Sequence, residues 1–163
     1  MDDKLKVLIS GCLLGQKVRW NLADKSSSSI KIFAEDNNIE LVPICPENEL
    51  FGTPRAPIRL IQIEDKLEAR MKGRDVSQEL NSKCQSIIED SEADGFIGIH
   101  GSPTCGLNGG VKNLGRTVKG SMHALSEFPT TEISQLKNPQ GKTAFLNRLV
   151  KHRQNSYNEQ GGA

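Results

Sequence analysis

Short apolar runs alternate along the chain with segments whose apolar residues recur every three or four positions. Three of the runs have the length and composition of buried strands: residues 6–10 (KVLIS), 39–44 (IELVPI) and 94–99 (DGFIGI). Between the first two, residues 26–37 are predicted to form a helix that begins at a run of serines and ends at Asn37 and Asn38. Strands and helices therefore alternate from the start of the chain.

The middle of the sequence combines a hairpin pattern with a second helix. Residues 58–63 (IRLIQI) and 67–71 (LEARM) alternate well enough to pair as a β-hairpin. The helix begins near Asp75, which stands three residues before Gln78 in the spacing of a capping box. Its apolar stripe consists of Val76, Leu80, Cys84, Ile87 and Ile88.

A last helix begins at Asn138 as N-cap and Pro139 as its first residue, and residues 156–163 are predicted to be a polar tail. Its inward-facing residues are predicted to be Phe145, Leu146, Leu149 and Val150. Strands that alternate with helices predict a single three-layer α/β domain over residues 1–155, with a mainly parallel sheet and a small hairpin.

Composition and charge restrict the setting of this domain. The chain has 163 residues and a formal net charge of +1, so no overall field favours nucleic acid or a membrane surface. No apolar run approaches the ~20 residues of a membrane span, and the opening MDDKLKVLIS is too acidic for a signal peptide. We therefore expect a cytoplasmic protein, in which the four cysteines are not expected to form disulfides.

Three of the cysteines share one kind of position. Cys12, Cys45 and Cys105 each follow a predicted strand, whereas Cys84 lies on the apolar stripe of a helix, where a cysteine is usually a small hydrophobe. Open α/β sheets bind ligands at the carboxyl ends of their strands, so the three thiols can converge there. No C-x-x-C spacing is present, so neither a zinc knuckle nor a thioredoxin-like site is indicated. Position alone leaves packing, a reactive thiol and metal ligation open.

A shared metal centre on these thiols would give their neighbours a role. Three thiolates leave one metal position open, which suits a sulfur-bearing substrate and needs groups that move protons. Glu47 and Ser102 lie close to Cys45 and Cys105 in the sequence and are the candidates, ahead of His100. The alternatives are a solvated loop carboxylate for Glu47 and a turn residue for Ser102.

Five motifs then point to a known family. CLLGQKVRW, VPICPE, FGTPRAP, KGRDVS and GSPTCG occur between Val7 and Leu149. In this order and spacing they resemble a bacterial family of domains of unknown function typified by the iron–sulfur-dependent thiouracil desulfidases. The resemblance implies a Rossmann-like domain that holds a [4Fe–4S] cluster on Cys12, Cys45 and Cys105.

The resemblance also implies a reaction. Glu47 would be the catalytic acid/base and Ser102 the catalytic serine of a non-redox desulfuration. In it the substrate sulfur binds the open iron, water attacks the carbon and hydrogen sulfide leaves. Arg19 and Arg55 are candidate contacts to a polar ring or a phosphate, with a structural arginine as the alternative for each.

Two loops depart from the family pattern and bear on the substrate. Residues 19–22 read Arg-Trp-Asn-Leu where the family usually has Arg-Tyr-Asp/Asn-Gly, and residues 107–115 lack the usual Asp-Gly pair. We expect both loops to line the pocket. A small thiolated pyrimidine, as base or nucleoside, is the expected substrate, and thiolated tRNA, used by related members, is the alternative.

Two other classes of function remain compatible with the residues. One is a cluster-binding or metal-binding module without catalysis, such as a sulfur carrier or sensor. The other is a domain with structural thiols that binds a small ligand without metal. The first predicts that Glu47→Ala and Ser102→Ala leave every measurable property intact, and the second predicts a colourless protein after anaerobic reconstitution.

Overall fold

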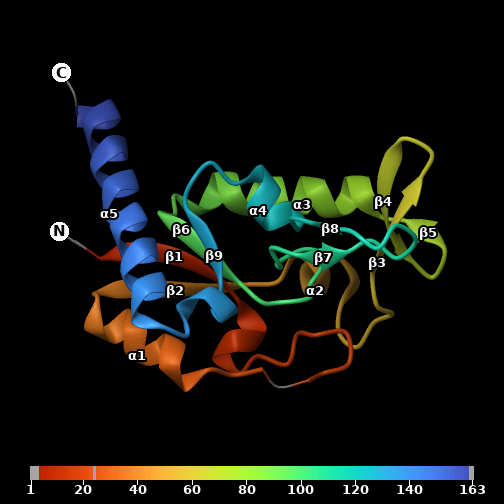
Figure 1. Ribbon diagram of the computed structural model, residues 1–163, viewed down its shortest axis with the longest axis horizontal. Coiled ribbons are helices and arrows are strands. Elements are labelled where there is room, and N and C mark those ends of the chain that lie inside the picture. Colours follow the sequence, from red (N-terminus) through yellow and green to blue (C-terminus); the bar gives the residue numbers. More distant parts are fainter. Residues whose placement is uncertain (1–3, 24, 162–163) are drawn as a thin grey trace.

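Four parallel strands form the centre of the molecule, which is described by a computed structural model over residues 4–23 and 25–161 (Figure 1). The sheet has the order β2-β1-β6-β9, and every neighbouring pair is parallel. Its strands are β1 (Leu5–Ser10), β2 (Ile39–Ile44), β6 (Gly95–Gly98) and β9 (Thr130–Glu132). The three strands predicted from apolar runs are thus present, and β9 was not predicted.

The burial of these strands follows their place in the order. The inner strand β1 is buried along nearly its whole length, as its apolar run KVLI requires. Strand β2 lies at an edge, and only Ile39 of its six residues is fully buried. The interpretation of residues 39–44 as a strand is confirmed, but the interpretation of that strand as buried is wrong.

Helices cover both faces of the sheet. Figure 1 shows α3 (Ser77–Ser91) and α4 (Ser121–Leu125) on one side and α1 (Ser28–Asp36) on the other. The long helix α5 (Pro139–Gly161) lies beside α1, with which it lines a shared hollow. The prediction of a three-layer α/β domain is confirmed. No helix in the described part of the chain is long and apolar enough to cross a membrane.

The predicted hairpin forms a small sheet of its own. Strands β3 (Arg59–Ile63) and β4 (Lys66–Met71) are antiparallel, and β5 (Arg74–Asp75) adds a third strand. The glycine-rich stretch forms β7 (Gly109–Gly110) and β8 (Thr117–Val118). The short helical elements are α2 (Pro46–Phe51), η1 (Gly11–Leu14) and η2 (Ile133–Leu136).

Two helix predictions need correction at the ends. Asp75 is part of β5, so α3 begins at Ser77, and Asp75 Oδ1 accepts hydrogen bonds from the Ser77 amide and hydroxyl instead of forming a capping box with Gln78. Helix α5 continues to Gly161, so the predicted tail is helical as far as the structure describes it. Val150 is 41% exposed and does not face the core, unlike Phe145.

The start of α5 generates a stability prediction. The Asn138 Oδ1 accepts a hydrogen bond of 2.7 Å from the Gly141 amide, which satisfies one of the free amides of the first turn. We expect Asn138→Ala to lower the free energy of unfolding by about 1 kcal/mol in urea denaturation. Asn155→Ala, at an exposed position inside the same helix, is the matched control and should not destabilise the chain. Equal effects of the two variants would contradict the capping role.

Candidate active site

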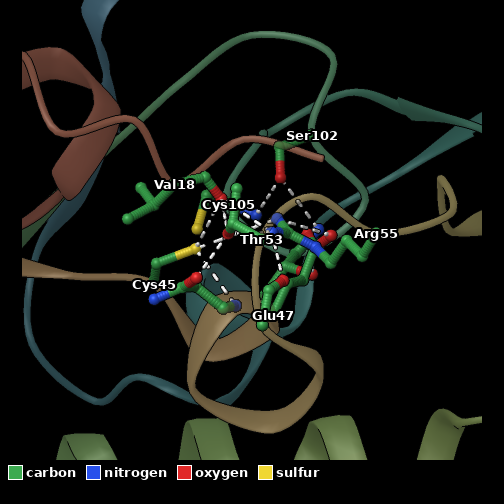
Figure 2. A network of polar contacts seen from close by, with 10 residues as sticks. Val18, Cys45, Glu47, Thr53, Arg55, Ser102 and Cys105 are labelled. Carbon is green, nitrogen blue, oxygen red and sulfur yellow. Dashed lines mark hydrogen bonds and ion pairs between the residues drawn. The ribbon is translucent and has the colours of Figure 1, made fainter. Parts of the chain in front are cut away.

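A pocket lies where β1, β2 and β6 end, with about 660 Å³ of empty space including the part open to solvent. Seven candidate site residues from the sequence line it, namely Cys12, Arg19, Cys45, Glu47, Arg55, Ser102 and Cys105. Figure 2 shows five of them, Cys45, Glu47, Arg55, Ser102 and Cys105. Cys84 does not line it and is fully buried in α3. The structure thus separates the cysteines into the three-plus-one set that their positions indicated.

Each of the three thiols is placed by the turn that follows its strand. Cys12 lies in η1, directly after β1. Cys45 is the N-cap of α2, and its Sγ accepts a hydrogen bond of 3.4 Å from the Asn48 amide. Cys105 lies in the loop after β6, and all four cysteines are free thiols. The carboxyl edge of the sheet therefore gathers three thiols from distant parts of the chain.

The loop that carries Cys105 is held by hydrogen bonds to its own backbone. The Ser102 Oγ accepts from the amides of Thr104 (3.2 Å) and Cys105 (3.0 Å). The His123 Nε2 lies 2.8 Å from the Cys105 carbonyl oxygen, to which it donates in the tautomer that carries hydrogen on Nε2. A Cβ at Gly98 would lie 1.7 Å from that same carbonyl, so only glycine lets the loop fold back onto β6.

Ser102 thus has the turn role that was the alternative to catalysis. Its oxygen organises the loop as an acceptor, and its own O–H finds no acceptor among the described residues. A hydroxyl can donate while it accepts, so the two roles are compatible. His100 does not line the pocket, and its Nδ1 lies 3.2 Å from Glu132 Oε1.

Glu47 is a buried carboxylate rather than a solvated one. It is 9% exposed, and Thr104 Oγ1 donates a hydrogen bond of 2.9 Å to its Oε2. The Arg55 Nη2 lies 3.4 Å from its Oε1. A carboxylate removed from water needs such partners, because its ionised form is otherwise too costly to bury.

The guanidinium of Arg55 is largely buried and hydrogen-bonded within the protein. Its side chain is 5% exposed, and Nη1 donates to the carbonyl of Val18 (2.8 Å) and the hydroxyl of Thr53 (2.9 Å). Nη2 contacts Glu47 and lies 4.0 Å from the Cys45 Sγ. Both terminal nitrogens are thus used internally, in the manner of a structural arginine (Figure 2).

Three buried polar atoms of the pocket-lining residues have no hydrogen-bond partner in the described chain. They are Ser10 Oγ, Arg19 Nε and Arg55 Nε. Buried polar groups are nearly always paired, so these atoms indicate a pocket that receives a polar or charged group.

Burial also governs the chemistry of the thiols. It raises the pKa of Cys12, with an opposing effect of Arg19, and raises the pKa of Cys45, with an opposing effect of the Asn48 amide. Burial raises the pKa of Cys105 well above the usual value for a thiol. Without a cation these groups are protonated at neutral pH, and a metal that binds them must displace their protons.

No group of three or more His, Cys, Asp or Glu side chains within residues 4–23 and 25–161 is arranged to hold a single metal ion. The three thiols share a pocket but do not form the closed donor set of a mononuclear site. A polynuclear centre imposes a different requirement, since each thiolate then binds its own metal atom.

Several pocket features were missed in the sequence. Thr104 is fully buried and binds Glu47 across 57 positions of the chain, and Ser10 lines the pocket at the end of β1. Thr104 lies inside the GSPTCG motif, but nothing local indicates its partner. Of the two loops expected at the pocket, Trp20 lines it, whereas none of residues 107–115 does, which corrects that expectation.

The family of the chain follows from its match to known proteins. Residues 7–154 match the family described as 2-thiouracil desulfurase. The chain belongs to the 2-thiouracil desulfurase family. The resemblance inferred from the five motifs is therefore confirmed, and so is the prediction of an enzyme.

The solved structure of a thiouracil desulfidase is similar to this chain in fold. The [4Fe-4S]-dependent thiouracil desulfidase TudS matches with a TM-score of 0.66 and 25% sequence identity, over 86% of this chain and 97% of TudS. A comparison with curated proteins finds no significant sequence match. Together, the family and the TudS match support a thiouracil desulfidase role for the chain.

Glu132, at the end of β9, also holds the Cys105 loop in place through hydrogen bonds made outside the pocket. Its Oε2 accepts a hydrogen bond of 2.8 Å from the Leu107 amide, and its Oε1 accepts one of 2.6 Å from the Ser134 hydroxyl. Burial raises the pKa of Glu132, but the hydrogen bonds from Ser134, Leu107 and His100 outweigh it and lower the pKa overall.

This lowered pKa makes the contribution of Glu132 to stability dependent on pH. The ionised side chain stabilises the fold above the ordinary pKa of 4.5, and that stabilisation is lost as the pH falls through the lower folded value. We expect Glu132→Gln to lower the free energy of unfolding by about 1–3 kcal/mol at pH 7. The deficit relative to wild type should shrink below pH 4.5 in urea titrations at several pH values. The exposed Glu127→Gln variant should stay within about 0.5 kcal/mol of wild type at pH 7, and a deficit of Glu132→Gln that grows towards low pH would contradict the assignment.

Proposed function

We propose that this chain removes sulfur from a thiolated pyrimidine and uses a [4Fe–4S] cluster held by Cys12, Cys45 and Cys105. One observation carries the proposal: the three strand-end thiols line the same pocket as the buried carboxylate of Glu47 and the Ser102 hydroxyl. The similarity to TudS, described as [4Fe-4S]-dependent, supports the choice of cofactor.

The donor set fits such a cluster better than a single ion. Three free thiols face one pocket without forming a single-ion site among the described residues, and a cubane spreads its irons over separate corners. Ser10 and Arg19, whose side chains act on the thiols of Cys105 and Cys12, can donate to cluster or substrate sulfur through Ser10 Oγ and Arg19 Nε. When bound, a cluster with three protein ligands supplies one open iron, a Lewis acid suited to a soft sulfur atom.

Two residues of the chain then carry out the proton transfer and the hydrogen bonding that the reaction needs. The net reaction exchanges the thiocarbonyl sulfur for oxygen: one water is consumed and one hydrogen sulfide is released. Glu47 takes a proton from the attacking water, so that oxygen adds to the thiocarbonyl carbon. The free O–H of Ser102 donates to the ring or the leaving sulfur. No electron is transferred, because carbon and sulfur keep their oxidation levels.

A second candidate substrate is a thiolated pyrimidine within RNA. A groove of about 900 Å³ runs along the hairpin and is lined by the cations Arg59, Arg70, Lys72 and Lys112. Arg59 and Lys112 also line a hollow that shares Gly101 and Pro103 with the main pocket. Arg70 is paired with Glu68, whereas the other three have no ion-pair partner among the described residues. A phosphate backbone would complement this surface.

The cluster is tested by its iron content. After anaerobic reconstitution we expect about four irons and four acid-labile sulfides per chain, with matching loss in Cys12→Ala, Cys45→Ala and Cys105→Ala. Cys84→Ala is the matched control and should keep its iron, because Cys84 is buried outside the pocket. Iron that depends equally on all four cysteines, or no iron in wild type, would contradict the proposed centre.

The activity is tested by sulfide release. Reconstituted enzyme should release sulfide from 2- or 4-thiouracil, from the thiouridines or from a short thiolated RNA. The compound from which sulfide is released fastest identifies the substrate class. Glu47→Gln should lower the rate by about 100-fold or more, since it removes a general base. Glu49→Gln is the control, because Glu49 is exposed on the same helix. If none of these compounds releases sulfide although the enzyme holds its full iron content, the chain is better explained as a non-catalytic cluster-binding module.

A further inference from the structure

We propose that Thr104 is a positioning residue that holds the carboxylate of Glu47 in its working orientation; the inference rests on the proposed function. Thr104 Oγ1 donates to Glu47 Oε2 at 2.9 Å, and both side chains are buried. Neither motif that contains these residues indicates the contact, which joins α2 to the loop after β6.

The hydroxyl of Thr104 has no other task in the described structure. The residue is fully buried, and the only hydrogen bond of its hydroxyl there is to Glu47. A buried hydroxyl without a partner costs free energy, so valine, which has the same shape, would fit this position better if the contact with Glu47 had no role. Because threonine is β-branched, its side chain is also stiff and fixes the direction of the bond.

The backbone of Thr104 is held independently of its hydroxyl. Its amide donates to Ser102 Oγ, and its carbonyl accepts a hydrogen bond of 3.0 Å from the Met122 amide. A Cβ at Gly120 would lie 2.5 Å from that carbonyl oxygen, which shows how closely the two segments approach. The loop therefore keeps its course when only the hydroxyl is removed.

Arg55 restrains the other oxygen of the carboxylate but cannot replace Thr104. Its Nη2 lies 3.4 Å from Glu47 Oε1, longer than the threonine bond, and its Nη1 serves Val18 and Thr53. A guanidinium can only donate, whereas a hydroxyl donates or accepts. Thr104 can therefore bond to Oε2 whether that oxygen is ionised or carries the proton taken from water, whereas Arg55 can serve Oε1 only as a donor.

Three variants test the assignment. Thr104→Val removes the hydroxyl and keeps the shape, and Thr104→Ser restores the hydroxyl. Thr131→Val is the matched control, because Thr131 is equally buried and bonds to Gln135 away from the pocket. The readouts are iron content, steady-state sulfide release, and the carboxyl ¹³C resonance of Glu47 in the metal-free full chain, assigned by its absence in Glu47→Gln.

We expect Thr104→Val to keep its iron, to lower kcat by about 10- to 100-fold with KM nearly unchanged, and to shift the Glu47 resonance. Thr104→Ser should recover kcat to within about 3-fold of wild type, a small loss for a hydrogen bond that is kept. Thr131→Val should leave kcat and the resonance unchanged.

Other outcomes overturn the proposal. An unshifted resonance with wild-type kcat in Thr104→Val would show that the contact does not orient Glu47. Loss of iron in Thr104→Val, or equal losses in the valine and serine variants, would show that residue 104 supports only the loop. If wild type releases no sulfide, the proposed function fails, and the resonance in the metal-free chain still decides whether Thr104 fixes the carboxylate.

Discussion

A chain of polar contacts from Arg55 through Glu47 to Thr104 connects the three loops that carry the cysteines. Arg55 holds the Val18 carbonyl in the segment after Cys12, Glu47 follows Cys45 at the start of α2, and Thr104 precedes Cys105. The sheet brings the loops to one edge, but parallel strands alone do not fix the distances between them. The buried carboxylate, with one charged and one neutral partner, supplies that constraint.

The rest of the architecture supports this link. The inner strand β1 is anchored on both sides, so the turn that carries Cys12 starts from a fixed point. Gly98 and Gly120 let segments lie closer than any side chain would allow, and Glu132 fastens the far end of the Cys105 loop through Leu107. Apolar packing thus sets the positions of the strands, and polar contacts set those of the loops.

Much of this organisation could be predicted from the sequence, because the hydrophobic period of a segment and the succession of elements along the chain can be read locally. The apolar runs located β1, β2 and β6, and the residues after them located the three thiols. The edge position of β2 could not be predicted, since it depends on the pairing of distant strands. The same holds for Thr104, whose partner Glu47 lies 57 residues away. Arg55 illustrates a different case, because the sequence left a substrate contact and a structural role open, and the fold gives its terminal nitrogens internal acceptors.

The hydrogen bonds that Ser102 and His123 make to the Cys105 loop require no metal. Many small metal-binding domains gain their fold only when the metal gathers the ligands. Here the loop takes its course from hydrogen bonds within the chain, so the fold itself presents the Cys105 thiol at a preformed site.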